Sequence, residues 1–165
     1  MRLRGHSSGI DPVREGKEVK LRAQRNEDAA MPVFAWTDQL AIDQGVMDDT
    51  HKEFVDLLNR VADAPEGEIL AVIDEFIEHT RQHFAQEERW MESLQFPPLH
   101  CHRNEHEGVL QIAGEVRNRV ANGEYRFGKV LAEAVYEWFE NHAASMDTVL
   151  SMYMKEHEYT PTVGA

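Results

Sequence analysis

The sequence predicts an all-α fold, an antiparallel four-helix bundle with up-down-up-down topology that follows an N-terminal arm. Two observations favour this fold: apolar residues recur at helical spacing in four successive stretches, and short breaks of turn residues separate those stretches. No stretch alternates apolar and polar residues as a half-buried strand would. Helices of roughly 15 to 27 residues joined by such short connections pack as antiparallel neighbours in a bundle.

Length and charge limit what the chain can do. Its 165 residues suffice for one domain with a sizeable core. There are 17 Lys and Arg residues against 30 Asp and Glu residues, a net charge of −13, so we expect neither nucleic acid nor a membrane surface as a partner. The single cysteine, Cys101, cannot form an internal disulfide, and no apolar run could span a bilayer or act as a signal peptide. These observations favour a cytoplasmic protein.

Residues 1–30 differ in composition from the rest of the chain. They hold seven Lys and Arg residues and five Asp and Glu residues, with few large apolar residues and no helical stripe. This composition predicts a disordered extension, either non-native or upstream of an alternative start at Met31. We expect the folded domain over residues 31–160. It opens with an irregular arm over residues 32–45, anchored by Phe34, Trp36, Leu40 and Ile42.

The first two predicted helices cover about residues 48–62 and 69–94. An aspartate or threonine at position 48, 49 or 50 is available to cap the start of the first helix. Pro97 and Pro98 are expected to end the second helix, because proline cannot continue a helical hydrogen-bond ladder.

The third and fourth predicted helices follow over about residues 99–120 and 131–153. The third has the thinnest apolar stripe, and its two glycines, Gly108 and Gly114, each cost a helix about 1 kcal/mol relative to alanine. Asn122 and Gly123 between them form a turn signal.

Nine histidines are the unusual feature of this composition. Five of them fall on the predicted buried faces, with at least one from each helix: His51, His83, His102, His106 and His142. A single buried histidine is typical of a hydrogen-bonded core residue, but an apolar bundle has too few polar partners for five imidazoles. Metal coordination would satisfy one nitrogen of each ring and leave the other for a neighbouring acceptor.

The spacing of these residues supports a metal site. His102 and His106 lie four residues apart, as do His83 and Glu87, and this spacing places both members of a pair on one helix face. Histidines alone leave zinc, copper and nickel open, whereas mixed imidazole and carboxylate ligation suits iron or manganese. Five imidazoles are too many for one ion with open positions, and two ions would need anionic bridges to offset their repulsion.

These residues resemble the seven-ligand pattern of the hemerythrin and bacteriohemerythrin family, whose member myohemerythrin is an established up-down-up-down bundle. The resemblance covers about residues 36–154 and includes intact HFxxEE and HxxxH motifs. The matching positions are, in order, His51, His83, Glu87, His102, His106, His142 and Asp147. Only the resemblance nominates Asp147, because it follows His142 by five residues, about 140° round an ideal helix.

The resemblance implies two iron ions. One would be bound by His102, His106 and His142, and the other by His51 and His83. Two carboxylates, from Glu87 and Asp147, would bridge the ions together with an oxo or hydroxo group.

The resemblance also implies that dioxygen binds at the iron that has two histidines. Apolar neighbours of the ligands, Trp138, Phe84 and Leu110, are candidates to line that pocket and keep water out. An ordinary core explains the same three residues equally well.

The other polar residues near these motifs have simpler explanations. His79 precedes His83 by one turn, and we expect it beside the site or at the surface rather than as an eighth ligand. His100 and His157 are expected to face solvent. Cys101 points away from the face that carries His102, so we expect a structural or half-exposed thiol.

Four functions are consistent with this pattern. The first is a non-enzymatic protein that binds dioxygen reversibly for carriage, storage, delivery or sensing. The alternatives are a di-iron redox enzyme acting on peroxide or nitric oxide, a metal-storage or buffering protein, and a signalling module with a separate, unknown partner. Ferritin-like di-iron enzymes use Glu-x-x-His motifs, and no histidine here has a glutamate three residues before it. We therefore expect an oxygen-binding protein rather than an enzyme.

Overall fold

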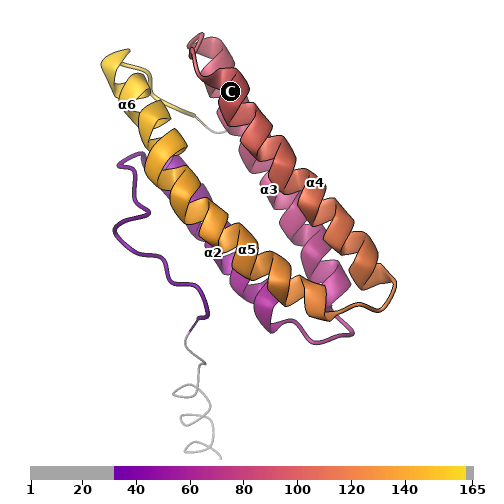
Figure 1. The fold of residues 1–165 in the computed structure, drawn as a ribbon. Helices are drawn as coiled ribbons and strands as arrows, with labels where there is room; N and C mark the ends of the chain where they lie inside the picture. The colour runs from indigo at the N-terminus through magenta and orange to yellow at the C-terminus, as the bar shows by residue number, and fades with distance from the viewer. Residues whose placement is uncertain (1–31, 163–165) are drawn as a thin grey trace, which may run out of the picture. The chain divides into compact units, whose positions relative to one another are not determined.

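The computed structural model describes residues 32–162, and the extension predicted over residues 1–30 lies outside this range. The described residues form helices and no strand: α2 (Gly45–Asp63), α3 (Ile69–Ser93), α4 (Leu99–Ala121), α5 (Arg126–His142), the π-helix η1 (Ala143–Asp147) and α6 (Thr148–Glu156). α2 packs against α3 and α5, and α4 packs against the same two helices. Four long helices thus form a closed ring of antiparallel neighbours (Figure 1). The predicted all-α, up-down-up-down bundle is confirmed.

The start of α2 differs from the prediction by three residues. The helix begins at Gly45, and none of residues 48–50 is its N-cap. Asp48 lies in the first turn instead, where its carboxylate accepts hydrogen bonds from the backbone N–H groups of Ile42 (2.9 Å) and Gln44 (3.1 Å). The side chain of an acidic residue in the first turn can accept hydrogen bonds from backbone N–H groups that precede the helix, as the glutamate of a capping box does. The apolar stripe alone does not reveal this earlier start.

α3 ends at Ser93, before the two prolines that were expected to end it. Gln95 adopts a left-handed conformation (φ 51°), and the N–H of Phe96 donates to the carbonyl of Met91 (2.9 Å). This is the hydrogen bond that closes a helix with a left-handed terminal residue. The predicted turn at Gly123 is also present, with a positive φ of 91°.

The two helices with the less certain sequence signals both form. α4 spans 23 residues despite its glycines. The fourth long helix runs from α5 through η1 into α6, so it covers the predicted stretch and extends it at both ends. None of the described helices is both long and apolar enough to cross a membrane.

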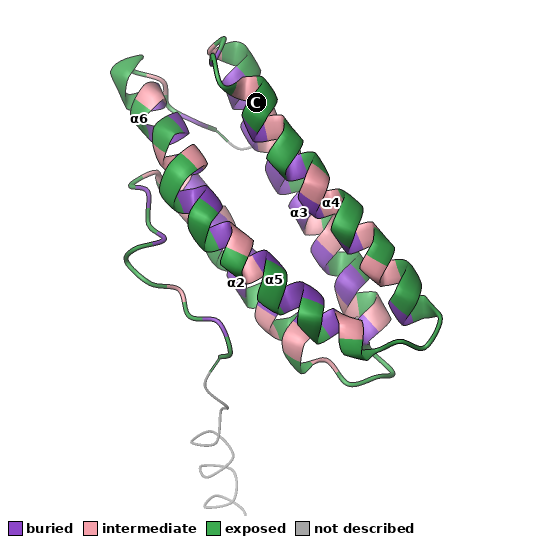
Figure 2. Ribbon diagram, viewed as in Figure 1, coloured by how far each residue is buried: buried purple, intermediate pink, exposed green. Residues whose placement is uncertain are grey.

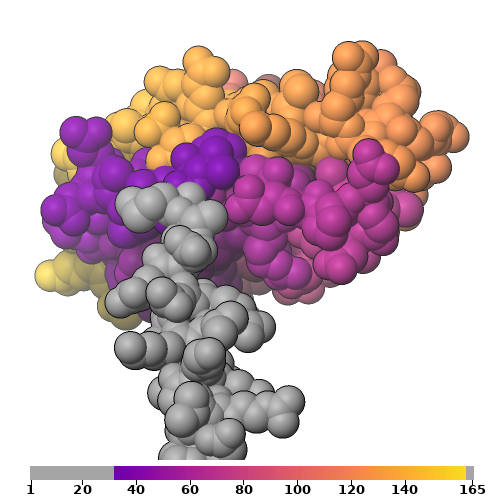
Figure 3. Space-filling view, turned by 90° about the horizontal axis from the view of Figure 1, so that it is seen from below, coloured from indigo at the N-terminus to yellow at the C-terminus, as the bar shows by residue number. Residues whose placement is uncertain are grey.

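The N-terminal arm, residues 33–44, lies against α2 and α5. The side-chain amide of Asn59 accepts from the N–H of Phe34 and donates to its carbonyl, both at 2.8 Å. The Phe34 ring stacks on Tyr136 with centroids 4.7 Å apart. Figure 3 shows the arm between the α2 side and the α5–α6 side of the bundle. Three of its predicted anchors are buried and the fourth is half-buried: Phe34, Leu40 and Ile42, then Trp36.

The buried side chains run along the inner faces of the helices (Figure 2). One half of the bundle contains the C-terminal end of α2, the N-terminal end of α3, the C-terminal end of α4 and the N-terminal end of α5. We call it the apolar half, because its buried centre consists of Val61, Ile69, Ile73, Val120 and Leu131. The other half, where the opposite helix ends meet, contains the five predicted histidines, and we call it the histidine half.

Candidate metal centre

The structure brings all seven predicted ligand residues together inside the histidine half. Their exposed fractions lie between 0% and 6%. All four long helices contribute: His51 from α2, His83 and Glu87 from α3, His102 and His106 from α4, His142 from the end of α5 and Asp147 from η1.

Three histidines and two carboxylates form the first group of donors. The Nε2 atom of His142 lies 3.0 Å from Nε2 of His102 and 3.2 Å from Nε2 of His106. Glu87 Oε2 lies 3.3 Å from His106 Nε2 and 3.5 Å from His102 Nε2. Asp147 Oδ1 lies 3.2 Å from Nε2 of both His102 and His142. Three imidazole nitrogens and two carboxylate oxygens therefore converge, which is a donor set suited to one metal ion.

Two histidines face the other oxygens of the same carboxylates. His83 Nε2 lies 2.9 Å from Glu87 Oε1, and His51 Nε2 lies 3.4 Å from that oxygen. Asp147 Oδ2 lies 3.5 Å from His51 Nε2. Each carboxylate thus directs one oxygen at the three-histidine group and the other at the two-histidine group, as a carboxylate that bridges two ions would.

The π-helix η1 explains how Asp147 reaches the site. A π-helix closes its hydrogen bonds over five residues instead of four, so residues five apart share a face. His142 ends α5 and Asp147 ends η1, and both side chains point into the centre. The hydroxyl of Thr148 donates to the carbonyl of Ala143, also five residues away, at 2.8 Å. Sequence spacing misses this aspartate because it assumes a regular α-helix.

The buried polar atoms of the cluster are poorly satisfied by the protein alone. The Nδ1 atoms of all five histidines lack a hydrogen-bond partner. The same is true of His51 Nε2, Glu87 Oε2 and Asp147 Oδ1. An unpaired buried polar group costs roughly 1–3 kcal/mol. Metal ions would engage the converging Nε2 and carboxylate atoms, so the donor set fits mixed imidazole and carboxylate coordination.

The pKa shifts of the cluster differ from one residue to the next. Burial and the Glu87 carboxylate oppose ionisation of Asp147, yet the imidazoles around it hold the pKa of Asp147 below its usual range. Burial lowers the pKa of His83 and of His106, which favours their neutral, ligating form. Burial also opposes protonation of His102, but the carboxylates of Asp147 and Glu87 together raise its pKa to about 9. A metal ion that binds His102 therefore has to displace a proton.

Aromatic rings hold the histidines of the three-histidine group in place. Phe84 stacks on His106 with centroids 3.8 Å apart and planes 3° from parallel. Trp138 stacks on His142 at 4.4 Å, and its Nε1–H donates to Glu105 Oε2 at 2.9 Å. Leu110 is half-buried against the main core. Of the three predicted pocket residues, Phe84 and Trp138 thus contact ligand rings, and a pocket role for each stays a prediction.

The two-histidine group is flanked by two phenylalanines that sequence reasoning missed as site residues. Phe139 meets His51 edge-on with centroids 5.1 Å apart, and Phe54 meets His83 at 5.8 Å. Each lies three residues from a histidine of its own helix, His51 or His142. That spacing is a usable signal, although it also describes ordinary core residues.

The remaining polar residues lie outside the cluster, as expected. His79 is half-buried, and its Nε2 lies 3.1 Å from Glu53 Oε2. Cys101, His100 and His157 are exposed.

Comparison with known proteins agrees with this geometry. The sequence model of the Hemerythrin HHE cation binding domain matches residues 44–153. A bacteriohemerythrin of Ralstonia nicotianae is 44% identical over 126 residues, which cover 76% of this chain and 92% of that protein. A bacteriohemerythrin of Stenotrophomonas maltophilia is 30% identical over 131 residues, which cover 77% of this chain and 85% of that protein.

The fold comparison points the same way. A crystal structure of wild-type hemerythrin superposes with a TM-score of 0.69 at 23% identity and covers 74% of this chain and 98% of that one. That likeness shows the shared fold, and the sequence matches show the family. The chain belongs to the hemerythrin family, with a histidine and carboxylate cluster of the kind that suits a non-haem di-iron protein.

Proposed function

We propose that this protein binds dioxygen reversibly at a di-iron centre and that it acts as a binding protein rather than as an enzyme. The observation that carries the proposal is the unequal donor count on the two sides of the shared carboxylates. Three imidazoles face one side and two face the other. An ion held by fewer protein donors keeps a position for an external ligand.

In this proposal each residue of the cluster has a defined part. One iron is held by His102, His106 and His142, the other by His51 and His83. Two carboxylates, Glu87 and Asp147, bridge the ions with an oxo or hydroxo group. When bound in the ferrous state, such a pair supplies the two electrons that dioxygen needs to bind as a reduced species.

The protein's own residues favour binding over turnover. Phe54 and Phe139 pack their rings against each other with centroids 5.1 Å apart, beside the two-histidine group. Phe54 and Phe139 are nearly or fully buried, so they keep water away from the face of the two-histidine group that α2 and α5 cover. Fewer nearby waters mean fewer protons to discharge a reduced ligand.

The stacked rings of Phe84 and Trp138 have a second part in the proposal. They fix the orientation of His106 and His142, which would hold the other iron. Of the three residues expected to line the dioxygen pocket, Trp138, Phe84 and Leu110, Phe84 also meets His83 of the two-histidine group, with ring centroids 5.2 Å apart. We further propose that the protein acts in the cytoplasm. A sensing role would need a separate signalling partner.

An optical experiment tests this function. The full chain is loaded with ferrous iron without air and then exposed to dioxygen. We expect an absorption band in the visible that appears with dioxygen and disappears when the gas is removed. His83→Gln, which removes a donor of the two-histidine group, should lose the band. His100→Gln, an exposed histidine outside the cluster, should keep it.

Metal analysis of protein made in iron-replete cells accompanies the optical test. Two iron ions per chain and a reversible band support the proposal. One zinc ion per chain, or a band that never reverses, overturns it. Consumption of peroxide or nitric oxide far faster than autoxidation would favour the enzyme alternative.

A further inference from the structure

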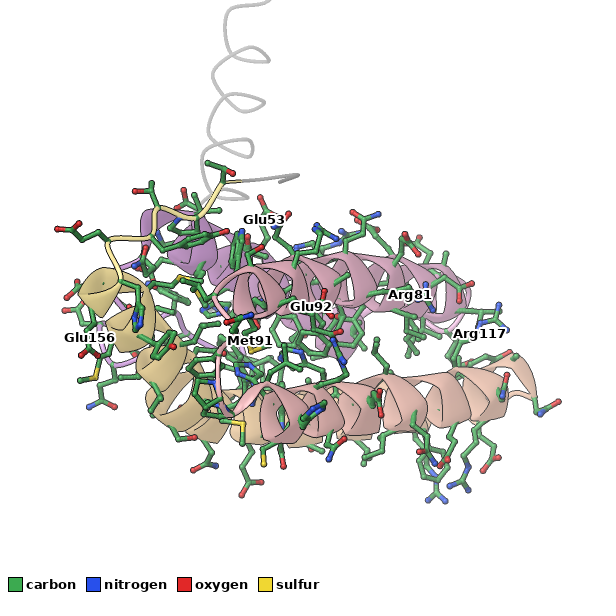
Figure 4. The ribbon with its side chains drawn as sticks, turned by 90° about the horizontal axis from the view of Figure 1, so that it is seen from above. Glu53, Arg81, Met91, Glu92, Arg117 and Glu156 are labelled. Carbon is green, nitrogen blue, oxygen red and sulfur yellow. The ribbon has the colours of Figure 1, made fainter. Side chains whose placement is uncertain are left out.

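A cleft on the outer side of α2 and α3 leads to the metal cluster. Its volume is about 520 Å³. The lining residues that matter here are Thr50 and Glu53 of α2 and His79, Gln82, His83 and Gln86 of α3. His83 belongs to the two-histidine group, so the cleft joins the surface to that side of the cluster. Figure 4 shows Glu53 at the outer edge of the bundle and Met91 between the helix pairs.

Glu53 and His79 form a pair of metal-type donors in this cleft. Glu53 Oε2 lies 3.1 Å from His79 Nε2. Two donors that bind one ion at right angles, with bonds of about 2.1 Å, lie about 3 Å apart. The Glu53 side chain is 68% exposed and that of His79 is 20% exposed, so one donor reaches solvent and the other faces inward.

His79 is also adjacent to the cluster itself. It precedes His83 by one helical turn, and the two rings meet edge-on with centroids 6.2 Å apart. An ion at Glu53 and His79 would need to move only about one turn, roughly 5–6 Å, to reach His83.

We propose that Glu53 and His79 form a way-station at which a divalent iron ion exchanges water for protein donors before it moves to His83 and Glu87. A carboxylate oxygen and an imidazole nitrogen are the donor types that suit ferrous iron. The inference rests on the proposed di-iron centre, and it adds a second, transient metal site outside the seven ligands.

A second cleft offers the alternative route, and its chemistry is wrong for a cation. This cleft, of about 290 Å³, reaches His102 on the three-histidine side. Its other lining residues are Phe96, Pro98, Ser145, Met146 and Val149. A hydrated ion entering there would lose water without gaining charged donors, which costs many kcal/mol. The first cleft supplies such donors before the ion reaches the cluster.

Two arginines line the first cleft, and both have acceptors. Arg81 donates to Glu78 Oε2 at 2.7 Å, and Arg89 donates to Gln86 Oε1 at 2.7 Å. The Arg81 charge is thereby balanced by a carboxylate. Glu53 also lines the cleft. Among the described residues, its carboxylate is paired with one side chain that can carry a positive charge, His79, which does so when its ring is protonated.

The test measures metal uptake by the full metal-free chain. Cobalt(II) is mixed with the protein without air, and its visible absorption follows binding over time. The double variant Glu53→Gln/His79→Gln should load roughly tenfold more slowly, because steering and capture by a charged donor change association rates by that order. The final cobalt content and the final spectrum should equal those of the unmodified chain. Added salt should narrow the difference in rate.

Two matched variants sharpen the measurement. Glu53→Asp keeps the charge and should recover part of the uptake rate. Glu133→Gln/His100→Gln removes one exposed glutamate and one exposed histidine away from the cleft and should load at the unmodified rate.

The outcomes separate this inference from the proposed function. Slow uptake with an unchanged end point supports the way-station. Unchanged uptake in Glu53→Gln/His79→Gln overturns it, and so does a lower final metal content, which would assign the pair a structural role. If the unmodified chain binds no cobalt, the di-iron centre itself is wrong.

Discussion

The two halves of the bundle use the same four helices in opposite ways. The apolar half is centred on aliphatic side chains such as Ile73 and Leu131, which are 0% and 2% exposed. The histidine half buries the seven side chains of the cluster, many of whose polar atoms lack hydrogen-bond partners. Each fully buried aliphatic side chain contributes about 1.5–3 kcal/mol to folding, whereas unpaired polar atoms oppose it. The apolar half therefore helps to hold the cluster in a shape ready for metal. A smaller apolar cluster beyond the histidines does the same from the other side: Ile42, Met47, Trp90, Met91, Phe96, Leu150 and Met154.

The largest effect is expected at a carboxylate shared by both groups of histidines. Glu87→Gln removes an oxygen from each side of the centre, so we expect the protein to lose both metal ions. Elemental analysis after gel filtration measures the loss. Glu78→Gln is the matched control, because Glu78 lies on the same helix, is exposed and accepts a hydrogen bond from Arg81 (2.7 Å). Two ions retained by Glu87→Gln would contradict the bridging geometry.

A cavity in the apolar half should lower stability without altering the centre. Ile73→Ala deletes a fully buried side chain, and such substitutions cost about 2–5 kcal/mol. Urea unfolding of the metal-free protein measures this cost. Metal content per folded chain should stay the same. A loss of metal from folded Ile73→Ala would show that the two halves are not separable.

Overpacking the apolar half should have a somewhat smaller effect. Gly128 lies so close to Ile69 that an added Cβ would overlap its side chain. Gly128→Ala is therefore expected to cost about 1–3 kcal/mol in the free energy of unfolding, measured in urea.

Two further variants control the Gly128 prediction. Ile69→Val in the same chain should recover part of the loss, because it removes the atom that overlaps most. Gly114→Ala on α4 meets nothing within 4 Å and should stabilise the protein by up to about 1 kcal/mol. Equal effects of alanine at both glycines would refute the steric argument.

The smallest effect is expected for an ion pair on the surface of the apolar half. Arg117 Nε lies 2.6 Å from Asp74 Oδ1, and Arg117 is labelled in Figure 4. The hydrogen bond that Arg117 donates lowers the pKa of Asp74. The pair therefore adds stability above the ordinary carboxyl pKa and loses it as the pH falls through the lowered value. Exposure to solvent keeps the contribution small.

Melting temperatures of the unmodified protein and of Asp74→Asn test this ion pair. The unmodified protein should melt slightly higher near neutral pH, and the difference should vanish in acid. A difference that grows in acid would have the wrong sign.

The sequence was sufficient for the fold and for the placement of most of the cluster. Apolar residues at helical spacing predicted all four helices, and the same periodicity put the histidines on the buried faces. Helix ends were less predictable, because they depend on individual hydrogen bonds. The carboxylate of Asp48 starts α2 early, and the left-handed Gln95 ends α3 before its prolines.

Two properties of the centre could be identified only from the structure. Helical periodicity could not nominate Asp147, because the local backbone leaves the α-helical geometry on which that periodicity depends. The division of the Glu87 oxygens between two groups of histidines is likewise a matter of side-chain direction. The roles of the seven residues as iron ligands stay predictions until metal is measured.

The π segment at residues 143–147 also has a consequence for protein design and for sequence alignment. It amounts to one additional residue accommodated within a helix whose flanks, α5 and α6, remain α-helical. A pattern search that required the aspartate four residues after the histidine would discard this chain. A designer can use the same device, because one inserted residue changes the register of everything downstream and redirects a side chain without breaking the helix.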